Sequence, residues 1–155
     1  MISYRQNKMD YKYYDDFIVG ETHKTDDVEV TKQEILEFGQ KYDPLPFHID
    51  EEAAAKTPFN GVIASGLQTF ALSQKQVVDS FFRESHLLGS VGFDEAEFPN
   101  PVRPGDILST TLEILEKRPS KSNPSRGLVT IMRKVVNQHD SVVLRVTNNV
   151  LVERQ

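Results

Sequence analysis

Asp43 and His48 are the pair of residues in this sequence best suited to proton-transfer chemistry. They lie five positions apart on a segment that contains Pro44 and Pro46. Each proline fixes its own φ and pushes the preceding residue towards an extended conformation, so we expect a stiff loop. A carboxylate and an imidazole held on one rigid loop can act as a general acid and base. The same residues also suit a helix-end turn and a hydrogen-bonded surface histidine, and the spacing alone favours that structural interpretation.

The composition excludes several other kinds of site. The 155 residues include no cysteine, which excludes disulfides, thiolate catalysis, cysteine-ligated zinc and iron–sulfur clusters. Glycine-rich phosphate-binding motifs and the zinc motif HExxH are absent, and the four histidines are far apart in the sequence. We therefore expect neither a metal site nor a bound cofactor.

Charge and hydropathy narrow the expected partners. The net charge is −5 and no run of Lys or Arg exceeds two residues, so we expect no nucleic-acid partner. No apolar run approaches the roughly 20 residues of a membrane span, and the start of the chain lacks an apolar signal region. These features favour a cytoplasmic protein that binds no membrane. The apolar content, 38%, is low and hints at a core completed across a subunit interface.

Helical patterns dominate the first half of the chain. Thr31 begins a capping-box pattern that opens a helix over about 31–41, just before Asp43. A short helical turn is expected at 51–56. A second capping-box pattern begins at Ser65 and opens a helix over about 66–83, roughly 27 Å long. Its expected apolar stripe comprises Leu67, Phe70, Ala71, Val77, Val78 and Phe81.

Strand patterns dominate the second half. Alternating residues predict three strands, over 106–117, 127–137 and 141–153, with a hairpin turn between the last two. A further short strand is expected within 22–30. We predict one α+β domain, in which an antiparallel sheet wraps around the long helix. An N-terminal arm of residues 1–14 precedes it.

Two segments together resemble the MaoC-like dehydratase family, the (R)-specific enoyl-CoA hydratases with a hotdog fold. Asp43, Pro46 and His48 match that family's D-x-N-P-x-H pattern. The sequence FPNPVRPGD at 98–106 resembles the family's turn into a strand. The resemblance covers roughly residues 15–153 and implies a MaoC-like hotdog domain over 15–155.

Two positions depart from the family pattern. Leu45 stands where Asn is usual, and Tyr42 stands where Gly usually precedes the Asp. The departure at Leu45 removes a polar side chain beside the acid–base pair. We expect it to affect substrate choice or the placement of water more than the capacity for acid–base chemistry.

The resemblance implies hydration of a 2-enoyl-CoA to a 3-hydroxyacyl-CoA, or the reverse dehydration. Asp43 and His48 would hold one water between them and share the proton transfers. Coenzyme A would enter as part of the substrate. The alternatives are an acyl-CoA thioesterase on the same fold and an acyl-CoA-binding protein without catalysis. Because members of the family pair edge to edge, a homodimer or a higher homo-oligomer is expected.

Four further residues are candidates for substrate contacts. Gly66, at the start of the long helix, and Gly92 could each supply a backbone N–H to the thioester oxygen. Gly66 equally suits packing of the helix against the sheet. Ser65 is expected first as the helix cap and second as a polar contact to Asp43. Arg103 could bind a coenzyme A phosphate or form a structural ion pair. Three aromatic residues suit either an acyl tunnel or the core: Phe47, Phe59 and Phe70.

Overall fold

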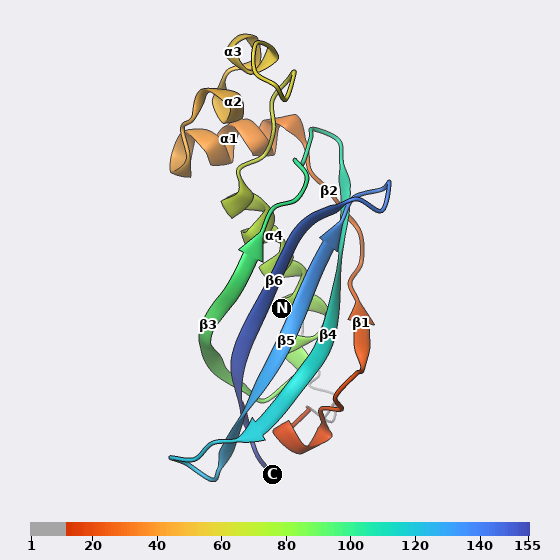
Figure 1. Ribbon diagram of the computed structural model, residues 1–155, viewed down its shortest axis with the longest axis vertical. Helices are drawn as coiled ribbons and strands as arrows, with labels where there is room; N and C mark the ends of the chain where they lie inside the picture. The colour runs from red at the N-terminus through yellow and green to blue at the C-terminus, as the bar shows by residue number, and fades with distance from the viewer. Residues whose placement is uncertain (1–11) are drawn as a thin grey trace, which may run out of the picture.

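A curved antiparallel sheet with one long helix against one face forms the body of the protein (Figure 1). The computed structural model describes residues 12–155. The strands are β1 (Thr22–Lys24), β2 (Val28–Glu29), β3 (Leu87–Glu97), β4 (Ile107–Pro119), β5 (Arg126–Val136) and β6 (Val142–Glu153). Their order in the sheet is β1-β4-β5-β6-β3, and β2 also pairs with β4. The predicted antiparallel sheet around a long helix is therefore confirmed.

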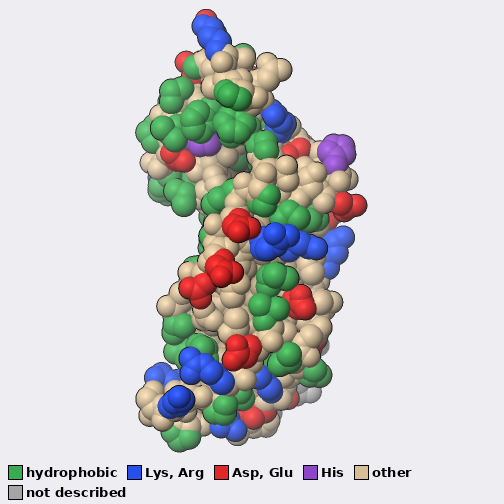
Figure 2. Space-filling view, in the orientation of Figure 1, with side chains coloured by type: hydrophobic (Ala, Val, Ile, Leu, Met, Phe, Trp, Pro, Cys, Tyr) green, Lys and Arg blue, Asp and Glu red, His purple; other side chains and the backbone are tan. Residues whose placement is uncertain are grey.

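The helices gather at one end of the sheet and along one of its faces. They are α1 (Lys32–Tyr42), α2 (Pro46–Ile49), α3 (Glu51–Ala55) and α4 (Gly66–Ser80), with 3-10 turns η1 (Tyr14–Asp16) and η2 (Phe82–Glu84). Helices α1 to α3 cluster beyond one end of the sheet, and α4 runs behind it (Figure 1). The opposite sheet face carries scattered side chains of both charges (Figure 2). No helix of the described residues 12–155 is long and apolar enough to cross a bilayer.

The first predicted capping box is confirmed. Thr31 Oγ1 accepts the Glu34 N–H at 3.2 Å, and the Glu34 carboxylate accepts the Thr31 N–H at 3.4 Å. This reciprocal pair satisfies two backbone donors that the first helical turn leaves free. Helix α1 then runs to Tyr42, which places Asp43 at its C-terminal cap.

The predicted stiff loop after Asp43 is partly helical. Leu45 is extended, as the residue before a proline should be, but Pro46 occupies the first position of the short helix α2. Proline is well suited to that position, because its φ is already helical and its missing N–H would have no partner there. His48 therefore lies on a turn of helix rather than on a loop.

Helix α4 begins where it was predicted, but its buried face differs from the prediction. Ser65 caps it, whereas Gln68 Oε1 has no partner among residues 12–155, so the second capping box does not close. Leu67 is 59% exposed and Ala71 is also exposed, while Val77 and Phe81 are buried as expected. Four polar residues of α4 are buried instead: Gln68, Thr69, Ser73 and Gln76.

Strand β3 is not predicted by the sequence patterns. It lies at the edge of the sheet, and its pairing with β6 shifts register three times. Leu88, Val91 and Phe93 of β3 are exposed, and only Leu87 at its start packs against the core. A regular alternation of apolar and polar residues needs one buried face, and this irregular edge strand lacks one.

The apolar core forms two clusters. One contains Phe81, Phe82 and the inward residues of the sheet beside them, and the other joins α1 and α3 to the opposite end of the sheet. Tyr14 is buried in the first cluster, so packing of the domain includes a residue assigned above to the arm. Residues 1–11 of that arm lie outside the described residues.

Candidate active site

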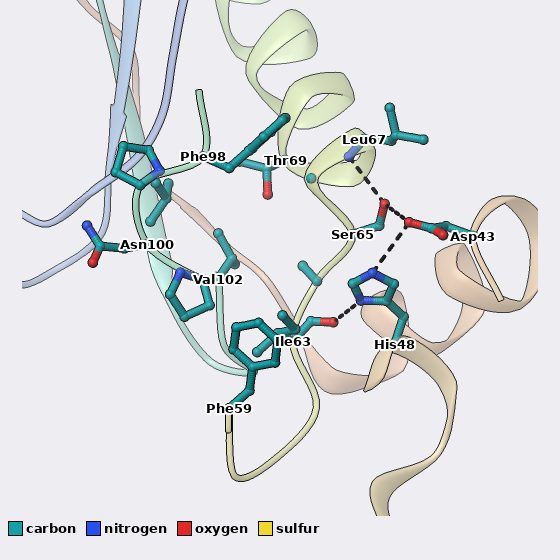
Figure 3. A pocket seen from close by; sticks show the side chains of 15 residues that line it. Asp43, His48, Phe59, Ile63, Ser65, Leu67, Thr69, Phe98, Asn100 and Val102 are labelled. Atoms are coloured by element: carbon teal, nitrogen blue, oxygen red, sulfur yellow. Dashed lines mark hydrogen bonds and ion pairs between the residues drawn. The ribbon is translucent and has the colours of Figure 1, made fainter. Parts of the chain in front are cut away.

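A cavity of about 430 Å³ lies between the start of α4, the end of α1 and the segment that connects β3 to β4. Figure 3 shows the predicted pair, Asp43 and His48, facing Ser65 on one side of it. The other side is formed by Phe98–Val102, and Phe59 lies below. The structure thus brings together four of the six residues singled out in the sequence: Asp43, His48, Ser65 and Gly66.

The imidazole of His48 is held in one orientation. Its side chain is buried, and Nδ1 lies 2.7 Å from the carbonyl oxygen of Ile63. A carbonyl can only accept, so Nδ1 carries a proton and donates it to Ile63. In the neutral ring the lone pair is then on Nε2, which lies 3.4 Å from Asp43 Oδ2.

A glycine in α1 permits this arrangement. A Cβ on Gly39 would lie 2.8 Å from the backbone oxygen of His48 and 3.0 Å from its Cβ. Such distances are too short for a side chain, so only glycine lets α1 and α2 approach this closely. That close approach is part of what fixes His48 beside Asp43, the residue that caps α1.

Ser65 links the acid–base pair to the start of α4. Its hydroxyl donates to Asp43 Oδ2 at 2.7 Å and accepts the Leu67 N–H at 3.2 Å. Because the backbone N–H can only donate, the hydroxyl proton is free to point at the carboxylate. Both expected roles of Ser65, the helix cap and the polar contact to Asp43, are therefore present.

Gly66 presents a free backbone donor at the cavity. Among residues 12–155 its N–H has no intramolecular acceptor, and it lies at the positive end of the 15-residue helix α4. A Cβ on Gly66 would lie 2.9 Å from two ring carbons of Phe98. Gly66 therefore also has a packing role, but it packs against the ring of Phe98 rather than against the sheet.

Gly92 and Arg103 do not line the cavity. Gly92 pairs with β6 in the middle of β3, and its carbonyl accepts from Asn148 at 3.2 Å. Of the two glycines considered as backbone donors, only Gly66 therefore lines this cavity. Arg103 donates to the Phe59 carbonyl at 2.7 Å, which is neither the ion pair nor the phosphate contact considered above.

The two departures from the family pattern lie outside the cavity lining. Leu45 is 47% exposed and Tyr42 is exposed as well. The expected influence of Leu45 on substrate choice therefore has no support in the described contacts. Its backbone has a role instead, because its carbonyl accepts the N–H of His48.

Several lining residues were missed at the level of sequence. Phe98, Asn100 and Val143 come from the sheet side, and Thr69 comes from α4. The FPNPVRPGD segment was the available signal, since it includes Phe98 and Asn100. Of the three aromatic candidates, Phe59 lines the cavity, whereas Phe47 and Phe70 pack against the core. Within the described part of the chain, no three acidic or histidine side chains converge as metal ligands.

Comparison with known proteins identifies a family and a close bacterial relative. Residues 16–137 match the model of the MaoC-like domain family. YdeM of Bacillus subtilis (strain 168), described as uncharacterized, is 35% identical over 140 residues, which are 90% of this chain and 98% of that protein.

Solved structures show the same architecture. The MaoC-like dehydratase from Rhodospirillum rubrum is 37% identical, with a TM-score of 0.86 over 93% of this chain and 98% of that one. The unliganded (R)-hydratase PhaJ1 from Pseudomonas aeruginosa is 25% identical, with a TM-score of 0.73 over 94% and 88% of the two chains. The predicted hotdog fold is confirmed, and the chain belongs to the MaoC-like domain family.

Proposed function

We propose that this protein adds water to a 2-enoyl-CoA to form a 3-hydroxyacyl-CoA, and catalyses the reverse dehydration, with Asp43 and His48 as its acid–base pair. The observation that carries the proposal is the approach of His48 Nε2 to Asp43 Oδ2, 3.4 Å apart on one side of the cavity. A dehydratase and an (R)-hydratase among the structural relatives support the reaction class.

The separation of the two groups suits a water molecule beside them. Nε2 and Oδ2, 3.4 Å apart, are too close for a water to lie between them, but both can accept hydrogen bonds from one water on the cavity side of the pair. During hydration the water loses a proton as its oxygen bonds to C3, and C2 gains a proton. No net oxidation or reduction occurs. Asp43 and His48 share these two transfers, and a positioned group of this kind contributes roughly 10²- to 10⁴-fold in rate.

Gly66 stabilises the negative charge that develops on the thioester oxygen. Its N–H points from the start of α4, where the helix dipole favours an anion. One such donor contributes roughly 2.7–4 kcal/mol to the transition state. Ser65 is a positioning residue in this scheme, because its hydroxyl donates to the carboxylate rather than to the thioester.

The remaining parts of the proposal concern partners. Arg103 uses Nη1 for the Phe59 carbonyl, and its other donors are available to a coenzyme A phosphate. Leu88 and Val91 on the edge strand β3 are exposed apolar residues that a second copy would cover. We propose a homodimer through this edge, with the acyl-CoA as substrate and neither a metal nor a further cofactor.

Two substitutions test the acid–base assignment. Asp43→Asn and His48→Gln should each reduce the hydration of crotonyl-CoA by at least about 100-fold while the far-ultraviolet spectrum stays native. Asp140→Asn and His139→Gln, on the exposed turn between β5 and β6, are the matched controls and should keep full activity. Near wild-type turnover in both site variants would show that the assignment is wrong.

The same assay separates the alternative functions. Loss of the enoyl-thioester absorbance without release of free thiol means hydration. Release of free thiol means thioester hydrolysis, and the protein is then a thioesterase. Binding of crotonyl-CoA and of longer enoyl-CoAs with neither signal means an acyl-CoA-binding protein without catalysis.

A further inference from the structure

Arg133 is a buried cation that the proposed mechanism does not use. It lies on β5, is 1% exposed, and is the largest fully buried side chain of the described residues. Nη2 donates to Asn148 Oδ1 at 2.7 Å. Nε and Nη1 are buried and have no acceptor among residues 12–155. Burial lowers the pKa of this guanidinium to about 10, so it is still a cation at neutral pH.

The surroundings of Arg133 do not compensate its charge. Among residues 12–155 no carboxylate contacts it, and its one hydrogen-bond partner there is a neutral amide. The rings of Phe82 and Phe93 lie 5.5 and 5.4 Å from the guanidinium carbon. Aromatic faces attract a cation but supply no acceptor for its N–H groups. An unpaired charge is among the most costly groups to bury, and such violations are expected mainly at functional sites.

A third unsatisfied atom lies on the face of α4 that carries Phe70. Phe93 makes an edge-to-face contact with Phe70 of α4, with ring centroids 4.7 Å apart. Gln74 follows Phe70 by four residues, so the two share one helix face. Gln74 Oε1 is buried and also has no partner in the described chain. Arg133 and Gln74 thus hold three of the six buried polar side-chain atoms that lack a hydrogen-bond partner among residues 12–155.

Two packing contacts connect this region with the candidate active site. Phe98 of the β3–β4 connection contacts Gly66 at the start of α4, and Phe93 of β3 contacts Phe70 one turn later. These two contacts show that β3 and α4 run alongside each other from the cavity towards Arg133. The rise from Gly66 to Phe70 is about 6 Å, at about 1.5 Å per residue. A substrate group that extends about one helical turn beyond the cavity therefore reaches Phe93.

We infer that Arg133 is the receptor for a carboxylate group that enters from the cavity, between α4 and β3. The ring of Phe93, which is 42% exposed, turns aside to admit it. A carboxylate can accept from the unpaired Nε–H or Nη1–H together with the remaining Nη2–H, because Nη2 shares one edge of the guanidinium with each of them, and it neutralises the charge. The carboxylate belongs either to the acyl group of a thioester substrate or to a free small carboxylic acid.

The first test compares two substrates of equal chain length, and this arm rests on the proposed function. Wild-type protein should prefer 2-hexenedioyl-CoA to 2-hexenoyl-CoA in kcat/KM by about 10- to 100-fold, the range of a charge-assisted hydrogen bond. Arg133→Met should abolish this preference while it keeps turnover of 2-hexenoyl-CoA. Arg145→Met removes an exposed arginine of β6 and is the matched control, which should retain the preference.

The second test does not depend on hydration. Titration calorimetry should show binding of glutarate, but not of the neutral glutaramide, to wild type and to Arg145→Met. Arg133→Met should bind neither compound, and Phe93→Ala should bind glutarate more tightly because no ring must move. If wild type hydrates neither substrate but binds glutarate through Arg133, the proposed function fails and the receptor stands, with a free acid as its ligand.

The inference is overturned by either of two results. One is a preference for the carboxylated substrate that survives in Arg133→Met. The other is a wild-type protein that shows neither the preference nor the binding of glutarate, in which case hydration of 2-hexenoyl-CoA would leave the proposed function intact.

Discussion

Removal of the Ser65 hydroxyl tests how the Asp43 carboxylate is held. Ser65 is fully buried and makes two hydrogen bonds, from the Leu67 N–H and to Asp43 Oδ2. The first is a helix cap and contributes about 1 kcal/mol. The second involves a charged group, and the Asp43 side chain is 25% exposed, so we take the lower end of the usual range, about 1.5 kcal/mol. Ser65→Ala should therefore lower the free energy of unfolding by about 2.5 kcal/mol.

A matched cap separates these two contributions. Thr31 caps α1 in the same way but makes no contact with the acid–base pair, so Thr31→Ala should cost only about 1 kcal/mol. A double-mutant cycle over Ser65→Ala and Asp43→Ala should then give a coupling energy of about 1.5 kcal/mol. The measurement is urea unfolding at one fixed protein concentration, because a dimer's stability depends on concentration.

Activity decides whether this hydrogen bond serves the chemistry. If Ser65 positions the carboxylate, kcat for crotonyl-CoA should fall by about tenfold in Ser65→Ala, the equivalent of about 1.4 kcal/mol. A coupling energy below about 0.5 kcal/mol would refute the assigned hydrogen bond. A normal coupling energy with unchanged kcat would refute the positioning role and leave Ser65 as a structural cap.

Two further predictions concern stability. Because burial lowers the pKa of Arg133 to about 10, its folded form loses a proton at lower pH than the unfolded form, so unfolding is linked to proton uptake and stability rises with pH. The difference in free energy of unfolding between wild type and Arg133→Met isolates this effect, because all other titrations cancel in it. Measured by urea unfolding, that difference should shift by about 1.4 kcal/mol in favour of wild type between pH 8 and pH 11. A difference that stays constant over this range would contradict the burial of a charged Arg133. Gly127→Ala should cost about 1–3 kcal/mol in the same assay, because its Cβ would overlap the buried ring of Tyr14. Gly89→Ala, where a Cβ meets nothing within 4 Å, is its control and should change stability little.

The parts of the site that were predictable from sequence are the local ones. Asp43 and His48 are five residues apart, so the caps and prolines around them determine their approach with little help from the rest of the chain. Ser65 was predictable as a cap for the same reason. The carbonyl of Ile63 fixes the tautomer of His48. It was not predictable, because any residue type at that position supplies the same backbone carbonyl.

The parts that were not predictable depend on contacts between distant segments. Strand β3 has no regular alternation, because it is an irregular edge whose apolar residues are exposed. The wall formed by Phe98 and Asn100 belongs to the connection after it, and its place beside α4 follows only from the sheet order. Periodicity detects burial on one face of an element, so it cannot detect an element that lacks such a face.

The buried polar face of α4 explains why the apolar stripe was assigned incorrectly. Gln76 donates to the carbonyl of Leu108 at 3.0 Å and accepts from the hydroxyl of Thr110 at 2.9 Å. A polar residue of α4 can therefore face the sheet at little cost, since its partners on β4 complete its hydrogen bonds. The apolar residue Leu67 then remains exposed. The low apolar content of the chain therefore follows in part from this polar layer within a single chain.

The two sides of this polar layer differ, and the difference bears on Arg133. On the β4 side, both functional atoms of the Gln76 amide have partners. On the β3 side, Arg133 Nε and Nη1 and Gln74 Oε1 have none among the described residues. Gln68 Oε1 of α4 and His23 Nε2 of β1, the strand next to β4, also lack a hydrogen-bond partner there, so unpaired atoms are not confined to the β3 side. Arg133 differs from them because it is a fully buried cation with two unpaired donors. A carboxylate-binding role requires such donors, because a ligand can complete only the bonds that the protein leaves open.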